Sequence, residues 1–254
     1  MILLSRMVPY IGGLLIGLTF EIWSLRPDWI VASVAIVVFI TVVSVWLLTG
    51  RAFRNFGFWN FVSTPLLFII GACTFLLLVD NFVVRQLFIV SIMVLYILIS
   101  QNIFSFNYRS KRYQPYALEN IYSYINMVTL FLIYASCYGA ALLLGISFWA
   151  FLPVIFILTG FLFTRTLWSY KIIWKDSKRF IFIVSVLLTE VAIAVYYLPT
   201  SFVVNAFILL VVYYLAANIF KDQLRDNFNP KAVRIYLLIS LSALIATFLT
   251  TRWD

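Results

Sequence analysis

The sequence contains no histidine and few charged residues. None of its 254 residues is histidine, and Asp, Glu, Lys and Arg together make up only 11% of the chain. Without histidine the protein lacks the commonest general base and the commonest zinc ligand. Serine–histidine and cysteine–histidine mechanisms and histidine metal sites are therefore excluded, and we expect no metal and no cofactor.

Cysteines and nucleotide-binding motifs are equally scarce. The two cysteines, Cys73 and Cys137, both fall within long apolar stretches. We expect them to pack as small apolar side chains rather than to form a disulfide or bind metal. The sequence has no glycine-rich phosphate loop, no paired-cysteine zinc spacing and no G-x-S-x-G nucleophile motif. It therefore offers no complete catalytic motif, and we do not expect an enzyme.

Apolar residues, in contrast, make up 65% of the chain, against about 45–50% in an ordinary soluble domain. Apolar runs near twenty residues are long enough to cross a bilayer as helices, whereas transmembrane β-strands alternate in polarity and give no such runs. We therefore predict an all-α, polytopic transmembrane helical bundle that forms a single integral membrane domain over residues 1–254. The predicted spans cover residues 9–25, 29–49, 59–79, 86–106, 119–144, 148–168, 180–198, 201–220 and 233–251.

The basic residues predict how these spans are oriented. Fifteen of the 18 Lys and Arg residues fall at one set of span ends, and only Arg26, Arg85 and Arg252 fall at the other. Because short cytoplasmic loops are enriched in Lys and Arg, we predict a cytoplasmic N-terminus and an external C-terminus. The net charge of +9 then reflects these loops and does not indicate nucleic-acid binding. We expect a multi-pass protein of a prokaryotic cytoplasmic membrane.

The most basic connector, residues 165–179, indicates contact with the membrane surface. It combines Lys and Arg with two tryptophans, as interfacial segments at headgroup depth do. Four of its residues are candidate anionic-lipid contacts: Lys171, Lys175, Lys178 and Arg179. A plain interfacial connector without a specific lipid site has the same composition.

One carboxylate, Glu190, lies inside an otherwise apolar segment, residues 180–199. Ten residues of helix from Phe180 place it about 15 Å deep, near the middle of the hydrocarbon. Acids within spans mark functional sites by default. The alternative is a neutral glutamic acid that makes one interhelical hydrogen bond, for which Asn126 and Asn205 are the candidate partners.

These features predict a non-enzymatic membrane scaffold or complex subunit, whose partners are the lipid bilayer and other membrane proteins. The alternative is a secondary transporter that uses Glu190 as an intramembrane proton or cation site, with helix kinks at Pro65 and Pro153. A lipid-acting membrane enzyme that uses Asp222 and Asp226 is the weakest reading, because one short loop supplies its only clustered acids.

The orientation can be tested with reporter fusions. Lys175 should be cytoplasmic and Asp254 external, because the Lys and Arg distribution is so uneven. A reporter that is active only outside the cytoplasm should therefore be active when it is fused after Asp254. If a reporter that works only in the cytoplasm is active there instead, both the orientation and the span count are wrong.

Overall fold

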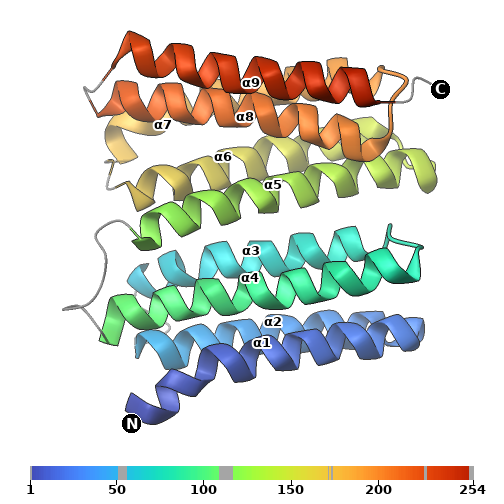
Figure 1. Cartoon of the computed structure of the whole chain (residues 1–254), viewed down its shortest axis with the longest axis vertical. Helices are drawn as coiled ribbons and strands as arrows, with labels where there is room; N and C mark the ends of the chain where they lie inside the picture. The colour runs from blue at the N-terminus through green and yellow to red at the C-terminus, as the bar shows by residue number, and fades with distance from the viewer. Residues whose placement is uncertain are drawn as a thin grey trace. The chain divides into compact units, whose positions relative to one another are not determined.

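The structure, a computed structural model, describes residues 2–50, 56–108, 117–170, 172, 174–225 and 228–251 (Figure 1). The chain divides into two compact units, Met1–Ile125 and Asn126–Asp254, and each is described here by itself. That the whole chain forms one membrane domain remains a prediction.

The first unit begins with four long helices. They are α1 (Ile2–Leu25), α2 (Ile30–Thr49), α3 (Phe56–Leu76) and α4 (Phe82–Tyr108), with the short 3-10 helix η1 (Pro27–Trp29) before α2. Helix α5 (Ala117–Leu143) starts in this unit and continues into the second from Asn126. The second unit also contains η3 (Phe148–Phe151), α6 (Leu152–Ser169), α7 (Trp174–Tyr196), α8 (Phe202–Leu224) and α9 (Pro230–Thr250).

These elements confirm the predicted all-α architecture. Within the described residues nine helices are long and apolar enough to cross a membrane, and no strand is present. The predicted spans coincide with α1 to α9 in order, and most ends differ by only a few residues. The largest difference is at α1, which begins at Ile2 and contains Pro9 inside the helix.

Two prolines of the predicted spans occupy different positions in their helices. Pro65 does lie inside α3, but Pro153 occupies the first turn of α6, directly after η3. The first-turn N–H groups of a helix have no intrahelical partner, so proline is well tolerated there. Pro153 therefore helps to start an α-helix instead of interrupting one, and a kink at this residue stays a prediction.

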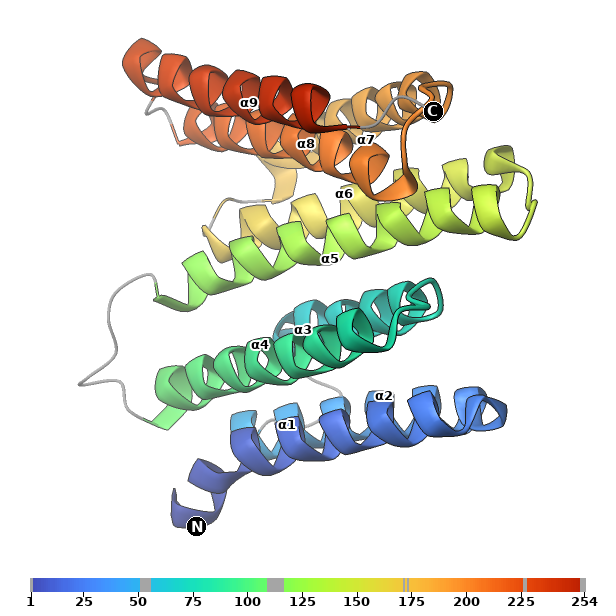
Figure 2. The same cartoon turned by 45° about the vertical axis from the view of Figure 1, so that its right-hand side comes forward.

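In the first unit, α1 packs against both α2 and α4 (Figure 2). Gly13 and Gly17, spaced as G-x-x-x-G, allow α1 to approach α4 closely. A Cβ atom on Gly13 would lie 2.4 Å from Ile97 Cγ1, and one on Gly17 would lie 3.2 Å from Met93 Sδ. Since lipid tails are as apolar as the side chains, close packing of this kind is a main source of helix association in membranes.

Polar contacts join α1 and α4 at the end where α1 finishes. The amide of Gln86 donates from Nε2 to both carboxylate oxygens of Glu21, at 2.9 and 3.0 Å. Arg85 donates to the carbonyl of Val79 and to Ser24 Oγ. The carboxylate of Glu21 is thus bound by a neighbouring helix rather than by Arg26, the partner that its sequence position suggests.

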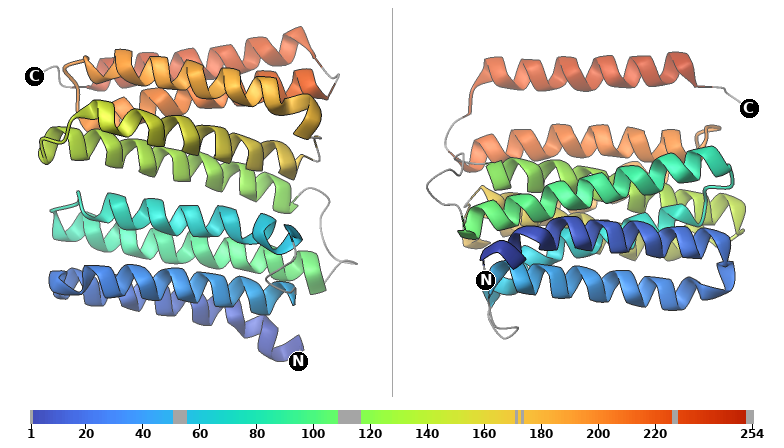
Figure 3. Two further views of the ribbon diagram at one scale, coloured as in Figure 1. Left: turned by 180° about the vertical axis from the view of Figure 1, so that it is seen from behind. Right: turned by 60° about the horizontal axis from the view of Figure 1, so that its bottom comes forward.

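The second unit is a chain of neighbouring helices in which α6 packs on α7, α7 on α8, and α8 on α9. Helix α9 lies next to α8 at the edge of the unit (Figure 3). Its buried residue is Ser240, whereas Leu238 and Leu249 are among its many exposed side chains. A helix that is apolar all round can present any face to lipid, which explains how α9 is accommodated with so little burial.

The glycine contact of α1 can be tested by substitution. Gly13→Leu should destabilise the protein by about 1–3 kcal/mol, because the new side chain cannot fit against Ile97 without moving it. Thermal unfolding in detergent measures the effect. Leu14→Ala is the matched control, since Leu14 is 54% exposed on the same helix. Equal stability of the Gly13→Leu and Leu14→Ala proteins would show that close approach at Gly13 is unimportant.

Candidate functional site

Glu190 lies on the exposed face of α7. The buried residues of this helix recur every three or four positions and form one face: Ser177, Ile181, Val184, Ser185, Leu188, Ala192 and Val195. The exposed face carries Phe182, Ile183, Glu190 and Ala194. The packing of α6 and α8 on α7 therefore leaves the carboxyl group of Glu190 pointing away from the interior of its own unit.

The depth of Glu190 differs somewhat from the sequence estimate. The membrane-length part of α7 runs from Ser177 to Tyr196, so at 1.5 Å per residue Glu190 lies about 20 Å from the first end and about 9 Å from the second. Side chains on a helix lean toward its N-terminus, which directs this carboxyl group away from the nearer end. A span with these ends would place Glu190 well inside the hydrocarbon, though not at its centre.

Among the described residues Glu190 has no hydrogen-bond or ion-pair partner. The structure does not bring it together with Asn126 and Asn205. Asn126 is fully buried and donates from Nδ2 to Thr166 Oγ1 on α6, at 3.2 Å. Asn205, near the start of α8, accepts a hydrogen bond from the hydroxyl of Thr200 in the preceding turn. Both asparagines therefore bind neighbours other than Glu190.

The interior of the second unit contains a polar ladder along α5, which we define as Asn126, Tyr134 and Tyr138. Thr166, the partner of Asn126, lies 3.2 Å from the hydroxyl of Tyr213 on α8. The Tyr134 hydroxyl lies 2.7 Å from Thr159 Oγ1 on α6. The polar ladder thus joins α5 to α6 and, through Thr166, to α8 by hydrogen bonds among side chains that are almost completely buried.

The last rung of the polar ladder fixes the orientation of α7. Tyr138 donates to the backbone carbonyl of Ala192 at 2.9 Å, and its ring stacks on Phe148, which in turn stacks on Tyr196. Two residues of α-helix correspond to a rotation of about 200°. The side chains of Ala192 and Glu190 therefore point in nearly opposite directions, and Glu190 faces away from the polar ladder.

The predicted lipid-contact residues are only partly described. Lys178 and Arg179 are exposed in the first turns of α7. Lys175 belongs to the same helix, but its side chain lies outside the described residues, as does the whole of Lys171. Contact of these four residues with anionic lipid remains a prediction.

A second basic cluster, which sequence reasoning missed, surrounds Tyr170. Lys221 Nζ lies 4.9 Å and Arg225 Cζ 5.0 Å from the centre of the Tyr170 ring, in the geometry of cation–π contacts. Lys221 lies in the last turn of α8 and Arg225 directly follows the helix, so their i, i+4 spacing brings both to one side of its end. That spacing is visible in the sequence, but the approach of Tyr170 is not.

The acids of the alternative enzyme site do not form a described pair. Asp222 accepts a hydrogen bond from the Tyr236 hydroxyl on α9, at 3.0 Å, while Asp226 lies outside the described residues. The part of the chain that the structure describes contains no group of three or more Cys, Asp or Glu residues positioned to hold a metal ion.

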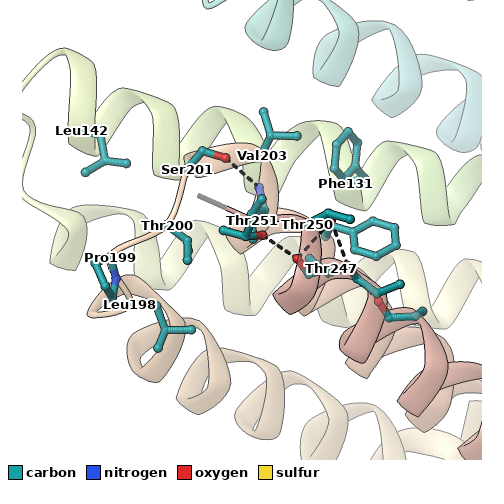
Figure 4. A pocket seen from close by; sticks show the side chains of 14 residues that line it. Phe131, Leu142, Leu198, Pro199, Thr200, Ser201, Val203, Thr247, Thr250 and Thr251 are labelled. Carbon is teal, nitrogen blue, oxygen red and sulfur yellow. Dashed lines mark hydrogen bonds between the residues drawn. The ribbon is translucent and has the colours of Figure 1, made fainter. Parts of the chain in front are cut away.

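A groove of about 1090 Å³ opens in the second unit between α5, the α7–α8 turn and α9 (Figure 4). Apolar side chains such as Phe131 and Leu198 form part of its lining, and threonines of α9 form another part. The hydroxyls of Thr247, Thr250 and Thr251 donate to carbonyls of their own helix. This groove can accommodate an apolar chain, but the hydroxyl protons of its three α9 threonines are already engaged.

Comparison of the chain with protein-family models, with curated proteins and with solved structures returns no match.

The contribution of the polar ladder can be measured at Tyr134. Tyr134→Phe removes the hydroxyl that pairs with Thr159. It should cost about 0.6–1.7 kcal/mol, between the mean and the maximum measured for hydrogen bonds between transmembrane helices. Reversible unfolding in mixed micelles gives this value. Tyr124→Phe, at a position 67% exposed on the same helix, should change stability little. A Tyr134→Phe protein as stable as the wild type would show that the ladder does not hold α5 to α6.

Proposed function

We propose that this protein is a non-enzymatic subunit or scaffold of a membrane complex, and that the exposed face of α7 binds a transmembrane helix of a different protein. That helix supplies a Lys, an Arg or another strong hydrogen-bond donor to Glu190. The observation that carries the proposal is the exposure of Glu190 within a membrane span, without a partner among the described residues.

The cost of leaving this acid in lipid supports a partner. An acidic side chain at the centre of a span costs about 2.5–3.5 kcal/mol on insertion scales, and less toward the ends. Neither the polar ladder nor the neighbouring helices reduce this cost, because Glu190 points away from them. A donor on another helix would offset the cost, and it would also make binding specific, since an apolar helix offers no comparable contact.

Charge complementarity favours a different protein over a second copy of this chain. The donor must lie at a similar depth, within the hydrocarbon. The most apolar segment of α7, like that of each other described span, contains at most two charged residues. The α7 helix of a second copy would present another carboxyl group to Glu190. A cationic or amide-bearing helix from elsewhere satisfies Glu190 better than a like charge does.

A secondary transporter remains the alternative function. Such a protein needs a polar route from one side of the membrane to its ion-binding acid. The polar ladder could belong to such a route, but it lies along α5 and contacts only the buried face of α7, at Ala192, which is turned away from Glu190. This arrangement favours binding at the exposed face over transport through the interior.

Site-specific photocrosslinking in native membranes tests the proposal. A photoreactive amino acid at Ala194, one turn from Glu190 on the exposed face, should crosslink a discrete membrane protein. Glu190→Leu should reduce the yield at least fivefold, whereas Glu190→Gln, which still accepts hydrogen bonds, should retain most of it. The matched control is the same probe at Leu238, which is 66% exposed on α9.

Three outcomes would contradict the proposal. A product of twice the mass of this chain would identify a second copy as the occupant. Equal yields from the Ala194 and Leu238 positions would indicate contact without specificity. Proton-coupled solute uptake by the purified protein in liposomes, abolished by Glu190→Gln, would favour the transporter.

A further inference from the structure

The second basic cluster, which consists of Tyr170, Lys221 and Arg225, lies where α6 and α8 end. Tyr170 directly follows α6, Lys221 is in the last turn of α8, and Arg225 directly follows α8. Asp222 is the one acidic side chain that the structure describes at this end of the second unit. The neighbouring helices α7 and α9 begin at the same end and add four exposed cations: Lys178, Arg179, Lys231 and Arg234.

The two cations of the cluster are not neutralised by a described carboxylate. Asp222 accepts a hydrogen bond from Tyr236 and forms no ion pair with Lys221 or Arg225 among the described residues. Lys221 Nζ donates one hydrogen bond, to Asn218 Oδ1 at 2.9 Å. The Arg225 guanidinium donates none to a described residue. Because an ammonium carries three N–H donors and a guanidinium five, most of these donors are open to a ligand.

The ring of Tyr170 holds the two cations near each other. Their charged groups lie 4.9 and 5.0 Å from its centre, although like charges four residues apart repel. Attraction to the ring and to the negative end of the α8 dipole offsets part of this repulsion. Neither attraction occupies the free N–H donors. An anion beside the ring would accept hydrogen bonds from these donors and would also remove the remaining repulsion.

The depth of the cluster indicates which anion is available. The candidate spans of α6 and α8 end at Ser169 and Leu224, so Tyr170 and Arg225 are each the first residue beyond an apolar span. Lys221 lies one turn deeper, and its long side chain can extend to the same boundary. In a bilayer this boundary is occupied by lipid headgroups. Basic pockets between transmembrane helices bind anionic headgroups, whereas a zwitterionic lipid would bring its own ammonium group near the cations.

We propose that the second basic cluster binds the phosphate group of an anionic phospholipid. Lys221 and Arg225 donate hydrogen bonds to the phosphate oxygens, and Tyr170 is a positioning residue that holds both cations. The acyl chains of the lipid lie along the apolar surface of the unit. The site uses none of the four residues that the sequence predicts as lipid contacts, and it is independent of the role proposed for the exposed face of α7.

Binding can be measured by native mass spectrometry of the delipidated full-length protein in detergent, titrated with phosphatidylglycerol. The double variant Lys221→Gln/Arg225→Gln should bind the first lipid at least fivefold more weakly, because it loses two charge-assisted contacts. The matched control is Lys231→Gln/Arg234→Gln, which removes the same charge from exposed positions at the same end. The control should weaken binding less than twofold.

Two substitutions of Tyr170 test its positioning role. Tyr170→Leu removes the ring that holds the cations and should weaken lipid binding two- to fivefold. Tyr170→Phe keeps the ring and should retain the affinity of the wild type, since a cation–π contact requires only the aromatic face. Thermal unfolding without lipid shows whether each variant is folded, so that a loss of binding is not mistaken for a loss of structure.

Three results would overturn the proposal. Equal losses in the two double variants would show that the lipid responds only to the overall charge of this end. Equally tight binding of phosphatidylcholine would show that the site does not select an anionic lipid. Displacement of the lipid by inorganic phosphate at the same concentration would identify a site for free phosphate instead.

Discussion

In hydrocarbon, a polar group can be satisfied only by another protein group or by a ligand, and the packing of both units follows from this constraint. It first requires the backbone to be helical across the membrane. It then selects the interior side chains. The five largest fully buried side chains are the tyrosines Tyr96, Tyr122, Tyr134, Tyr138 and Tyr213, while many leucines and valines are exposed. Apolar residues are as stable in contact with lipid as in the interior, so the interior is occupied by residues that need hydrogen-bond partners.

The two units meet this constraint with different contacts. In the second unit, hydroxyl and amide groups pair across helices, as in the Asn126–Thr166–Tyr213 series of the polar ladder. In the first unit, glycines bring α1 close to α2 and α4, and Glu21 is bound by Gln86. Tyr122 adds one further link, to the backbone carbonyl of Phe61 on α3.

The proposed function comes from a place where the constraint is not met. Glu190 is a strong hydrogen-bonding group that is exposed, so only a group from outside its unit can satisfy it.

The sequence by itself was enough to predict the number, order and approximate ends of the helices. Each span is an apolar run of membrane length, and both properties are local. The faces of the helices were decided by tertiary structure alone. A soluble helix reveals its buried face by an apolar stripe, but a helix in lipid is apolar on both faces, so α7 gave no sign that Glu190 would point outward. Several side-chain contacts depend on residues distant in the chain or on the exact turn between helices. They are the contacts of Asn126 and Asn205 with their partners, of Tyr170 with Lys221 and of Gln86 with Glu21. Even Pro153 required the structure, because its effect depends on whether a helix has already begun at that residue.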